Sequence, residues 1–180
     1  MQERLILEGE LFEVLIRRLA QQLIENHYPF DQTVLIGLQP RGIDLARRLK
    51  SVLESELDRE IPMGQLDVTF YRDDFRRRDS PIQANKTDIP FIIEDKKVVL
   101  IDDVLYTGRT VRAALDAMLA FGRPLKVELL TLVDRKYVRD LPVMANYVGR
   151  EVNTLKSQHV EVEWKENGFE LDRIWLKNIN

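Results

Sequence analysis

The chain has 180 residues, of which 27 are lysine or arginine and 30 are aspartate or glutamate, so its formal net charge is −3. It has no cysteine and two histidines, which excludes disulfides, thiolate metal sites, a cysteine nucleophile and a histidine-rich metal centre. The near-neutral charge gives no general sign of nucleic-acid or membrane binding, and the length favours a single domain over residues 1–180.

Helical and strand patterns alternate along the chain. Apolar residues at helical spacing predict helices over 10–27, over 42–57 and from about 109 to 121, where Gly122 would end the helix. Apolar runs predict strands over 33–38, 66–70, 98–101 and 127–133, and shorter ones over 147–148, 160–164 and 171–176. The alternation predicts an α/β fold with a central, mostly parallel sheet flanked by helices, and the non-helical tail predicts a small C-terminal hood over the strand ends.

The most informative stretch is residues 98–110, Val-Val-Leu-Ile-Asp-Asp-Val-Leu-Tyr-Thr-Gly-Arg-Thr. A buried strand would end on Asp102 and Asp103, and the loop after it would lead into a helix. Such a loop directs backbone N–H groups and the positive end of the helix dipole at an anion, and Gly108 permits close approach. The loop therefore favours a phosphate, whereas the carboxylates before it repel one. A sugar phosphate, with hydroxyls or a metal ion at its other end, satisfies both.

The ordinary alternative for this stretch is a capped turn without a ligand. For an isolated Asp-Asp pair, that is the commoner interpretation. The complete block is more specific than its parts, because the acids, the glycine and the hydroxyls of Thr107 and Thr110 occur together.

A second loop repeats the order of strand, tight loop and helix. Residues 33–38 run into Gln39-Pro40-Arg41-Gly42 and then into the helix predicted over 42–57. Arg41 would lie at the helix N-terminus, where its guanidinium can donate to phosphoryl oxygens. Alone, such a turn is usually an ordinary loop. Pro40 supplies neither a hydroxyl nor an N–H, so anion contacts would depend on Arg41 and the amides around Gly42; the sequence leaves open whether the Gln39–Pro40 bond is cis.

These blocks resemble the phosphoribosyl pyrophosphate (PRPP) loop of the type I phosphoribosyltransferases, and the resemblance implies their fold. Within that class the chain is similar to the bifunctional pyrimidine-operon regulators with uracil phosphoribosyltransferase activity. The similar segments are 67–74, 88–90, 102–112, 121–124, 132–135 and 141–142, within about residues 5–178. Val104-Leu105-Tyr106 is the most discriminating, because purine-specific relatives usually have other residues there.

The resemblance implies that uracil and PRPP react to give UMP and pyrophosphate with Mg²⁺. Asp102 and Asp103 would hold the ribose hydroxyls and the hydrated metal. Arg72, in the polar loop of residues 71–90, would neutralise the departing pyrophosphate from a lid that closes over PRPP; the alternative is an ordinary surface loop. The implied substrate-binding residues are Pro40, Arg41, Gly42, Val104, Leu105, Tyr106, Thr107, Gly108, Arg109, Thr110 and Arg135. Arg135 and segment 156–160 are candidates to flank the uracil, and both histidines are interpreted as surface residues.

The resemblance also implies an RNA-binding role, in which UMP or UTP promotes binding of an mRNA leader to a basic face of a homodimer or higher oligomer. Candidate basic residues are Arg17, Arg18, Arg123, Lys136, Arg139, Arg150 and Lys156. The segment 136–142, Lys-Tyr-Val-Arg-Asp-Leu-Pro, departs from the Gly-His-Arg-Glu-Leu-Pro usual in that family. The chain start lacks the apolar core of a signal peptide and no run reaches membrane-spanning length, so we expect a cytoplasmic protein without membrane contact.

Three functions stay open from the sequence. The first is an enzyme of pyrimidine salvage, the second is an RNA-binding regulator that uses the nucleotide site only as a sensor, and the third is a purine phosphoribosyltransferase. The two loops indicate a ribose phosphate ligand, but the choice of base and the binding of RNA depend on the resemblance alone.

Overall fold

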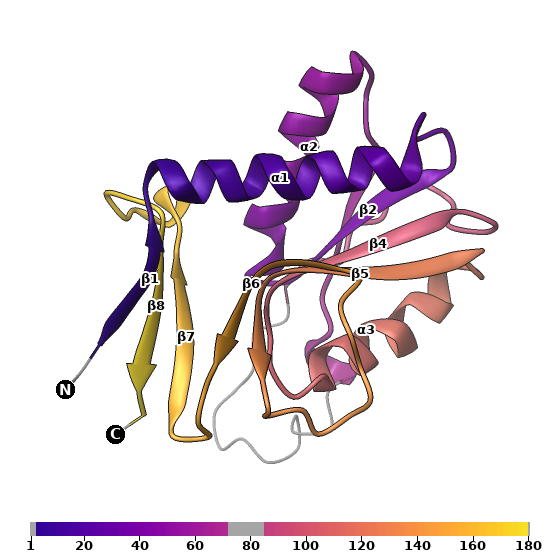
Figure 1. The fold of residues 1–180 in the computed structure, drawn as a ribbon. Helices are drawn as coiled ribbons and strands as arrows, with labels where there is room; N and C mark the ends of the chain where they lie inside the picture. The colour runs from indigo at the N-terminus through magenta and orange to yellow at the C-terminus, as the bar shows by residue number, and fades with distance from the viewer. Residues whose placement is uncertain (1–2, 72–84, 180) are drawn as a thin grey trace.

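The computed structural model describes residues 3–71 and 85–179 and has two sheets (Figure 1). The central sheet is parallel, with strands in the spatial order β3 (Met63–Leu66), β2 (Thr33–Leu38), β4 (Lys97–Leu105), β5 (Lys126–Lys136) and β6 (Tyr147–Asn153). The second sheet is antiparallel, in the order β1 (Arg4–Glu8), β8 (Arg173–Asn178) and β7 (Gln158–Glu163). The helices are α1 (Glu10–His27), α2 (Gly42–Leu57) and α3 (Arg109–Met118), with 3₁₀ turns η1 (Thr69–Tyr71), η3 (Leu119–Phe121) and η4 (Lys165–Asn167).

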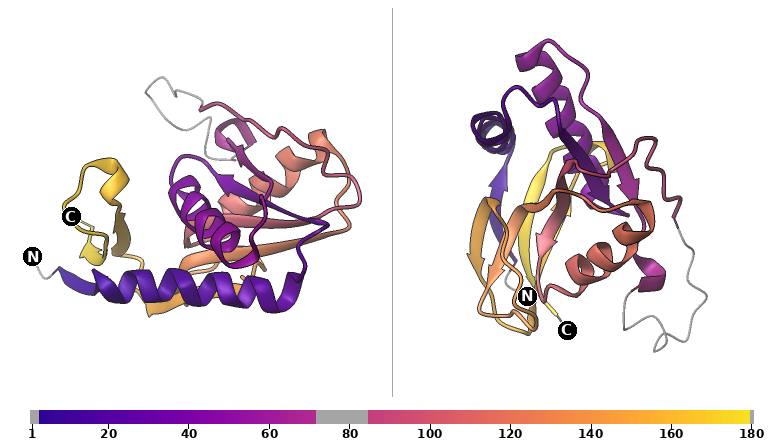
Figure 2. Two further views of the ribbon diagram at one scale, coloured as in Figure 1. Left: turned by 90° about the horizontal axis from the view of Figure 1, so that it is seen from above. Right: turned by 90° about the vertical axis from the view of Figure 1, so that its right-hand side faces the viewer.

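The central strands are apolar on both faces because helices cover both sides of the sheet. Leu35, Val99 and Leu130 pack with α1 and α2 in one core. Their neighbours along each strand, such as Ile36 and Leu100, point the other way and pack against α3. Figure 2 shows α1 and α2 on one side of the sheet and α3 on the other.

Several sequence predictions agree with the observed elements. The helices over 10–27 and 42–57 and the strand over 33–38 have the predicted bounds. Helix α3 ends at Met118 and continues as η3 to Phe121, just before Gly122. The predicted α/β fold with a parallel sheet is confirmed.

Other predictions need correction. The strand predicted over 66–70 is wrong, because the strand is Met63–Leu66 and the residues after it form a loop with η1. β4 continues through both acids to Leu105, and β5 and β6 are longer than predicted. The hood, which we define as β1, β7, β8 and residues 164–172, includes an N-terminal strand that the sequence analysis missed.

None of the helices in residues 3–71 and 85–179 is long and apolar enough to cross a membrane.

His27 is buried, which contradicts its interpretation as a surface residue. Its Nε2 lies 2.7 Å from Glu128 Oε2, and its Nδ1 lies 3.1 Å from Thr33 Oγ1. Burial lowers the pKa of His27, and the opposing charge of Glu128 does not compensate. This cluster lies where α1 ends and β2 begins, at the opposite end of the sheet from the strand ends that carry the two acids.

We expect the stability of the protein to fall as the pH decreases below about 6.5, the ordinary pKa of histidine. The unfolded chain takes up a proton there that folded His27 resists, so protons favour unfolding. His27→Gln should remove this part of the pH dependence and cost about 1–3 kcal/mol at pH 8, because buried hydrogen bonds are lost. Urea unfolding of both proteins between about pH 5 and pH 8 tests this; parallel pH profiles would contradict it.

Candidate active site

The site lies at the carboxyl ends of β2 and β4, where the loop of residues 39–42 meets the two acids. The start of α2 packs so closely on β4 that a Cβ atom at Gly42 would lie 2.3 Å from the carbonyl oxygen of Ile101 and 3.0 Å from the Cα of Asp102. Only glycine fits this contact. It brings Arg41, which is exposed and precedes α2, next to the acidic pair.

The Gln39–Pro40 peptide bond in this loop is cis, which answers the question that the sequence left open. The Gln39 side chain donates from Nε2 to Gln65 Oε1 at 2.8 Å, and its backbone N–H donates to Leu66 O at 2.9 Å. The loop is thus attached to β3 as well as to β4.

Asp102 and Asp103 lie within β4 and are buried, contrary to the expectation of a solvent-facing strand end. Oδ1 of Asp102 accepts from the backbone N–H of Asp103 at 3.0 Å, and Oδ1 of Asp103 accepts from that of Val104 at 2.8 Å. Oδ2 of Asp103 is buried and has no hydrogen-bond partner among the described residues. Burial raises the pKa of Asp103, and the positive charge of Arg41 opposes that rise.

A buried carboxylate oxygen without a partner is costly unless a ligand completes it. The described part of the chain contains no group of three or more histidine and carboxylate side chains that could hold a metal alone. Two adjacent carboxylates nevertheless fit Mg²⁺, which often takes one or two protein carboxylates and fills its shell with water and substrate phosphates.

The loop between β4 and α3 has the predicted form. Gly108 has φ +91°, and a Cβ there would lie 3.1 Å from Val143 Cγ2, so glycine is needed for both the turn and the packing. The carbonyl of Thr107 accepts from the backbone N–H groups of Asp140 and Leu141, each at 3.1 Å. The segment 139–143 therefore braces the loop.

Two supporting residues were missed by sequence reasoning. Arg139, a candidate for RNA contact, donates to the carbonyl of Tyr106 and forms an ion pair with Asp134. Thr131, from β5, accepts from the backbone N–H of Leu105 at 3.2 Å. Neither residue belongs to a recognisable sequence motif. Their contacts with the loop appear only when β5 and the residues that follow it are placed beside β4.

Arg135 is buried, which argues against an ordinary surface residue. Its guanidinium carbon lies 3.8 Å from the ring centroid of Tyr106. It donates from Nε to Thr154 Oγ1 at 3.1 Å, and from Nη2 to the carbonyls of Gln158 at 2.6 Å and Leu155 at 3.3 Å. Burial lowers the pKa of Arg135, and Tyr106 opposes this. The structure thus joins Arg135 to segment 156–160, the two candidates for the base site.

Arg72, the predicted lid cation, lies outside the described residues. Tyr71 is described and exposed at the end of η1. Asp67 joins the two described ends of the 72–84 segment, because its Oδ1 accepts from Thr69 N–H at 2.9 Å and its Oδ2 accepts from Asn85 N–H at 2.5 Å. This role of Asp67 was not predicted.

A parallel sheet that presents two acids, a glycine-turned loop at a helix N-terminus and a second arginine-containing loop defines a phosphoribosyltransferase type of domain. The sequence matches the phosphoribosyl transferase domain family over residues 4–167. Among solved structures, the hypoxanthine-guanine phosphoribosyltransferase of Bacillus anthracis superposes with a TM-score of 0.71 at 17% identity, over 99% of this chain and 100% of that one. The hypoxanthine phosphoribosyltransferase of Trypanosoma cruzi gives 0.71 at 17% identity, over 98% and 97%. At such identity these structures show the fold.

Closer relatives narrow the class. The chain is 46% identical to the bifunctional protein PyrR of Desulfosudis oleivorans over 92% of this chain and 91% of the relative. It is 42% identical to that of Enterococcus faecalis over the same shares, and 40% identical to that of Syntrophobacter fumaroxidans over 97% and 92%. The chain belongs to the family of bifunctional PyrR proteins.

Proposed function

We propose that this protein transfers ribose 5-phosphate from PRPP to uracil, giving UMP and pyrophosphate, and that it regulates pyrimidine-operon expression by nucleotide-dependent binding to an mRNA leader. The observation that carries the enzymatic half is the contact of Gly42 with Ile101, which places an arginine loop beside two buried acids. The choice of uracil rests on the identity with bifunctional PyrR proteins over nine-tenths of both chains.

Each part of PRPP has a counterpart in the proposed site. The loop of residues 104–110 at the start of α3 would bind the 5′-phosphate. Asp102 and Asp103 would hold the ribose hydroxyls and a hydrated Mg²⁺, which would supply charge neutralisation for the pyrophosphate. Arg41 and the amides near Pro40 and Gly42 would bind the pyrophosphate, which leaves from the side facing α2.

The residues act by position and electrostatics, and no covalent nucleophile is required. Charge builds up on the departing pyrophosphate, and Arg41 would stabilise it there. The base would lie on the other side of the anomeric carbon, against the wall made by Tyr106, Arg135 and segment 155–158. Arg72 would add a second positive charge when its loop closes over the substrate.

The structure reduces the number of basic residues that are available to bind RNA. Arg18 donates to the carbonyl of Gly149 at 2.6 Å, and Lys136 pairs with Glu151 at 2.8 Å. Arg123 follows η3, near the start of β5, whereas Lys136 lies at the end of that strand. Within the described chain, the exposed candidates without an ion pair are Arg17, Arg18, Arg123, Arg150 and Lys156, of which Arg18 is already engaged with backbone carbonyls. We propose Arg150, in the middle of β6, and Lys156, shortly after the end of that strand, as RNA contacts.

Pyrophosphate release from PRPP, measured with uracil, hypoxanthine, xanthine and orotate in turn, tests the enzymatic proposal. We expect a preference for uracil in kcat/KM of at least about 10²-fold, since a site that hydrogen-bonds one base leaves polar groups unpaired with another. Absence of turnover with uracil would overturn the enzymatic assignment. Turnover with hypoxanthine alone would favour a purine enzyme.

Asp103→Asn should lower kcat/KM by at least about 10²-fold, because the amide binds Mg²⁺ and ribose hydroxyls more weakly than a carboxylate. The melting temperature should not fall, since the substitution removes a buried charge one of whose oxygens has no hydrogen-bond partner in the described chain. Asp116→Asn, on the exposed side of α3, is the control and should retain wild-type activity. A large loss of melting temperature in Asp103→Asn would show a structural carboxylate instead.

Filter binding to the leader of the protein's own pyrimidine operon tests the RNA proposal. We expect UMP to strengthen binding, and expect Arg150→Ala combined with Lys156→Ala to reduce the slope of log affinity against log salt by about 2, one for each phosphate contact. Arg123→Ala is the control, because that residue lies away from β6. An RNA affinity that does not change when UMP is added would count against regulation by this protein.

A further inference from the structure

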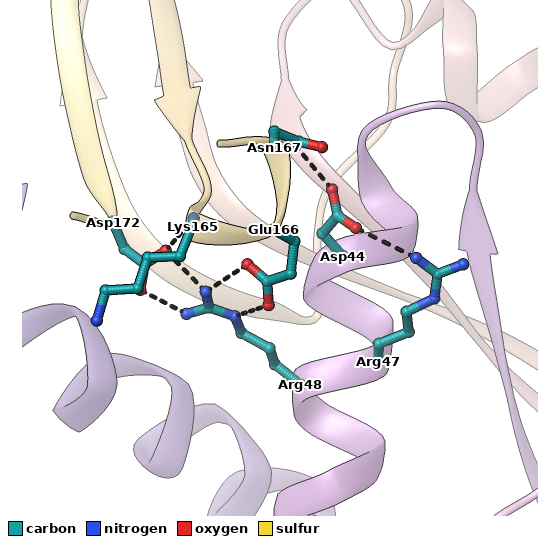
Figure 3. Close-up of polar contacts among 7 residues, drawn as sticks. All are labelled: Asp44, Arg47, Arg48, Lys165, Glu166, Asn167 and Asp172. Atoms are coloured by element: carbon teal, nitrogen blue, oxygen red, sulfur yellow. Dashed lines mark hydrogen bonds and ion pairs between the residues drawn. The ribbon is translucent and has the colours of Figure 1, made fainter. Parts of the chain in front are cut away.

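The hood is joined to α2 by a cluster of charged side chains centred on Arg48 (Figure 3). Arg48 donates from Nε and Nη2 to the two carboxylate oxygens of Glu166 at 2.8 and 2.6 Å. It donates from Nη1 and Nη2 to those of Asp172 at 2.8 and 2.7 Å. One guanidinium therefore holds two carboxylates of the hood in paired contacts, the geometry in which arginine is most specific.

This cluster is more than a surface ion pair. The Asp172 side chain is 3% exposed and that of Arg48 is 19% exposed. The guanidinium carbon lies 4.9 Å from the ring centroid of Trp164 and 5.8 Å from that of Phe12, which is on α1. Burial alone would lower the pKa of Arg48, but the two carboxylates outweigh it and raise the pKa above its usual value. A desolvated, fully paired group of this kind fixes orientation.

A second contact lies closer to the proposed pyrophosphate loop. Asn167, in η4, donates from Nδ2 to Oδ2 of Asp44 at 3.1 Å. Asp44 is in the first turn of α2, two residues after Gly42, and is itself buried. Figure 3 shows Asn167 and Glu166 of the hood facing the first turns of α2. The hood is therefore attached to the helix whose N-terminus carries Arg41.

The opposite side of the hood has its own attachment. Arg135 binds the carbonyls of Leu155 and Gln158, just before and at the start of β7, and stacks on Tyr106 of the other anion loop. The hood is thus held by one arginine from α2 and by another from β5. These two elements carry or contact the two loops that would bind the ends of PRPP.

We propose that Arg48 is a positioning residue for the base, because it holds the hood at a fixed place relative to the pyrophosphate loop. The inference rests on the proposed phosphoribosyl transfer. In that reaction the base must approach the anomeric carbon opposite the departing pyrophosphate, and an error of about 1 Å can cost 10²-fold in rate. Because its guanidinium is paired with Glu166 and Asp172, Arg48 would act through these two residues of the hood.

Arg48→Met tests this inference, because methionine keeps much of the apolar stem and removes the guanidinium. We expect the KM for uracil to rise about 10-fold and kcat to fall about 10-fold, within the range for a misplaced reactant. The KM for PRPP should change less than about 2-fold, since the Gly42 contact and the Gly108 loop do not involve the hood. Arg47→Met is the matched control: its side chain is 60% exposed and, among the described residues, pairs only with Asp44, at 3.4 Å.

If Arg48→Met does not fold, Glu166→Gln gives the same test in milder form, because Glu166 is 43% exposed and Asp172 still holds Arg48. We expect a selective rise in the KM for uracil of about 3-fold, intermediate for a partly retained contact. Kinetic constants per folded active site equal to wild type, with only a lower melting temperature, would make Arg48 merely structural and overturn the inference. No turnover of uracil by the wild-type protein would instead overturn the proposed function, and this inference with it.

Discussion

The close packing of α2 on β4 is the constraint on which the rest of the site depends. A Cβ atom at position 42 would lie 2.3 Å from the carbonyl oxygen of Ile101, so α2 can begin this close to β4 only with glycine at its first position. This contact sets Arg41 beside Asp103, where its positive charge opposes but does not cancel the rise in the pKa of Asp103 that burial causes. Gly37 of β2 permits a similarly close approach of α2 one helical turn further on, since a Cβ at Gly37 would lie 2.9 Å from that of Ala46. The parallel sheet thus supplies a rigid base on which two anion loops lie side by side.

The parts of the site that could be predicted are those in which one short segment carries the whole signal. The acids and Thr107–Thr110 are contiguous, and the periodicity of residues 10–27 and 42–57 is strong enough to give helix bounds directly. The predictions that failed concerned features that depend on contacts between residues far apart in the sequence. The β1 strand pairs only with β8, near the other end of the chain, and the burial of Asp103 requires the start of α2 to lie against it. Arg48 has no motif, and its importance appears only when Glu166 and Asp172 are placed in space.

Charged residues in this protein are largely used to join elements. Arg18 caps carbonyls of β6, Arg139 braces the phosphate loop, and Arg48 holds the hood. Counting basic residues in the sequence therefore overestimates the charge that remains for RNA phosphates. A regulator with a net charge of −3 can still bind RNA if a few unpaired cations lie together, because the salt-dependent affinity depends on the number of phosphate contacts and not on total charge.

The two kinds of attachment differ in what they permit. The loop at Gly42 is fixed by close packing on the backbone of Ile101 and Asp102, and the loop at Gly108 by a positive-φ turn that packs on the Val143 side chain. The hood, by contrast, is attached through side chains: the apolar core in which Trp164 packs on Phe12, and the hydrogen bonds of Arg48 and Arg135. A bisubstrate site benefits from this division, because PRPP needs a preformed cradle whereas the base must enter and the product must leave.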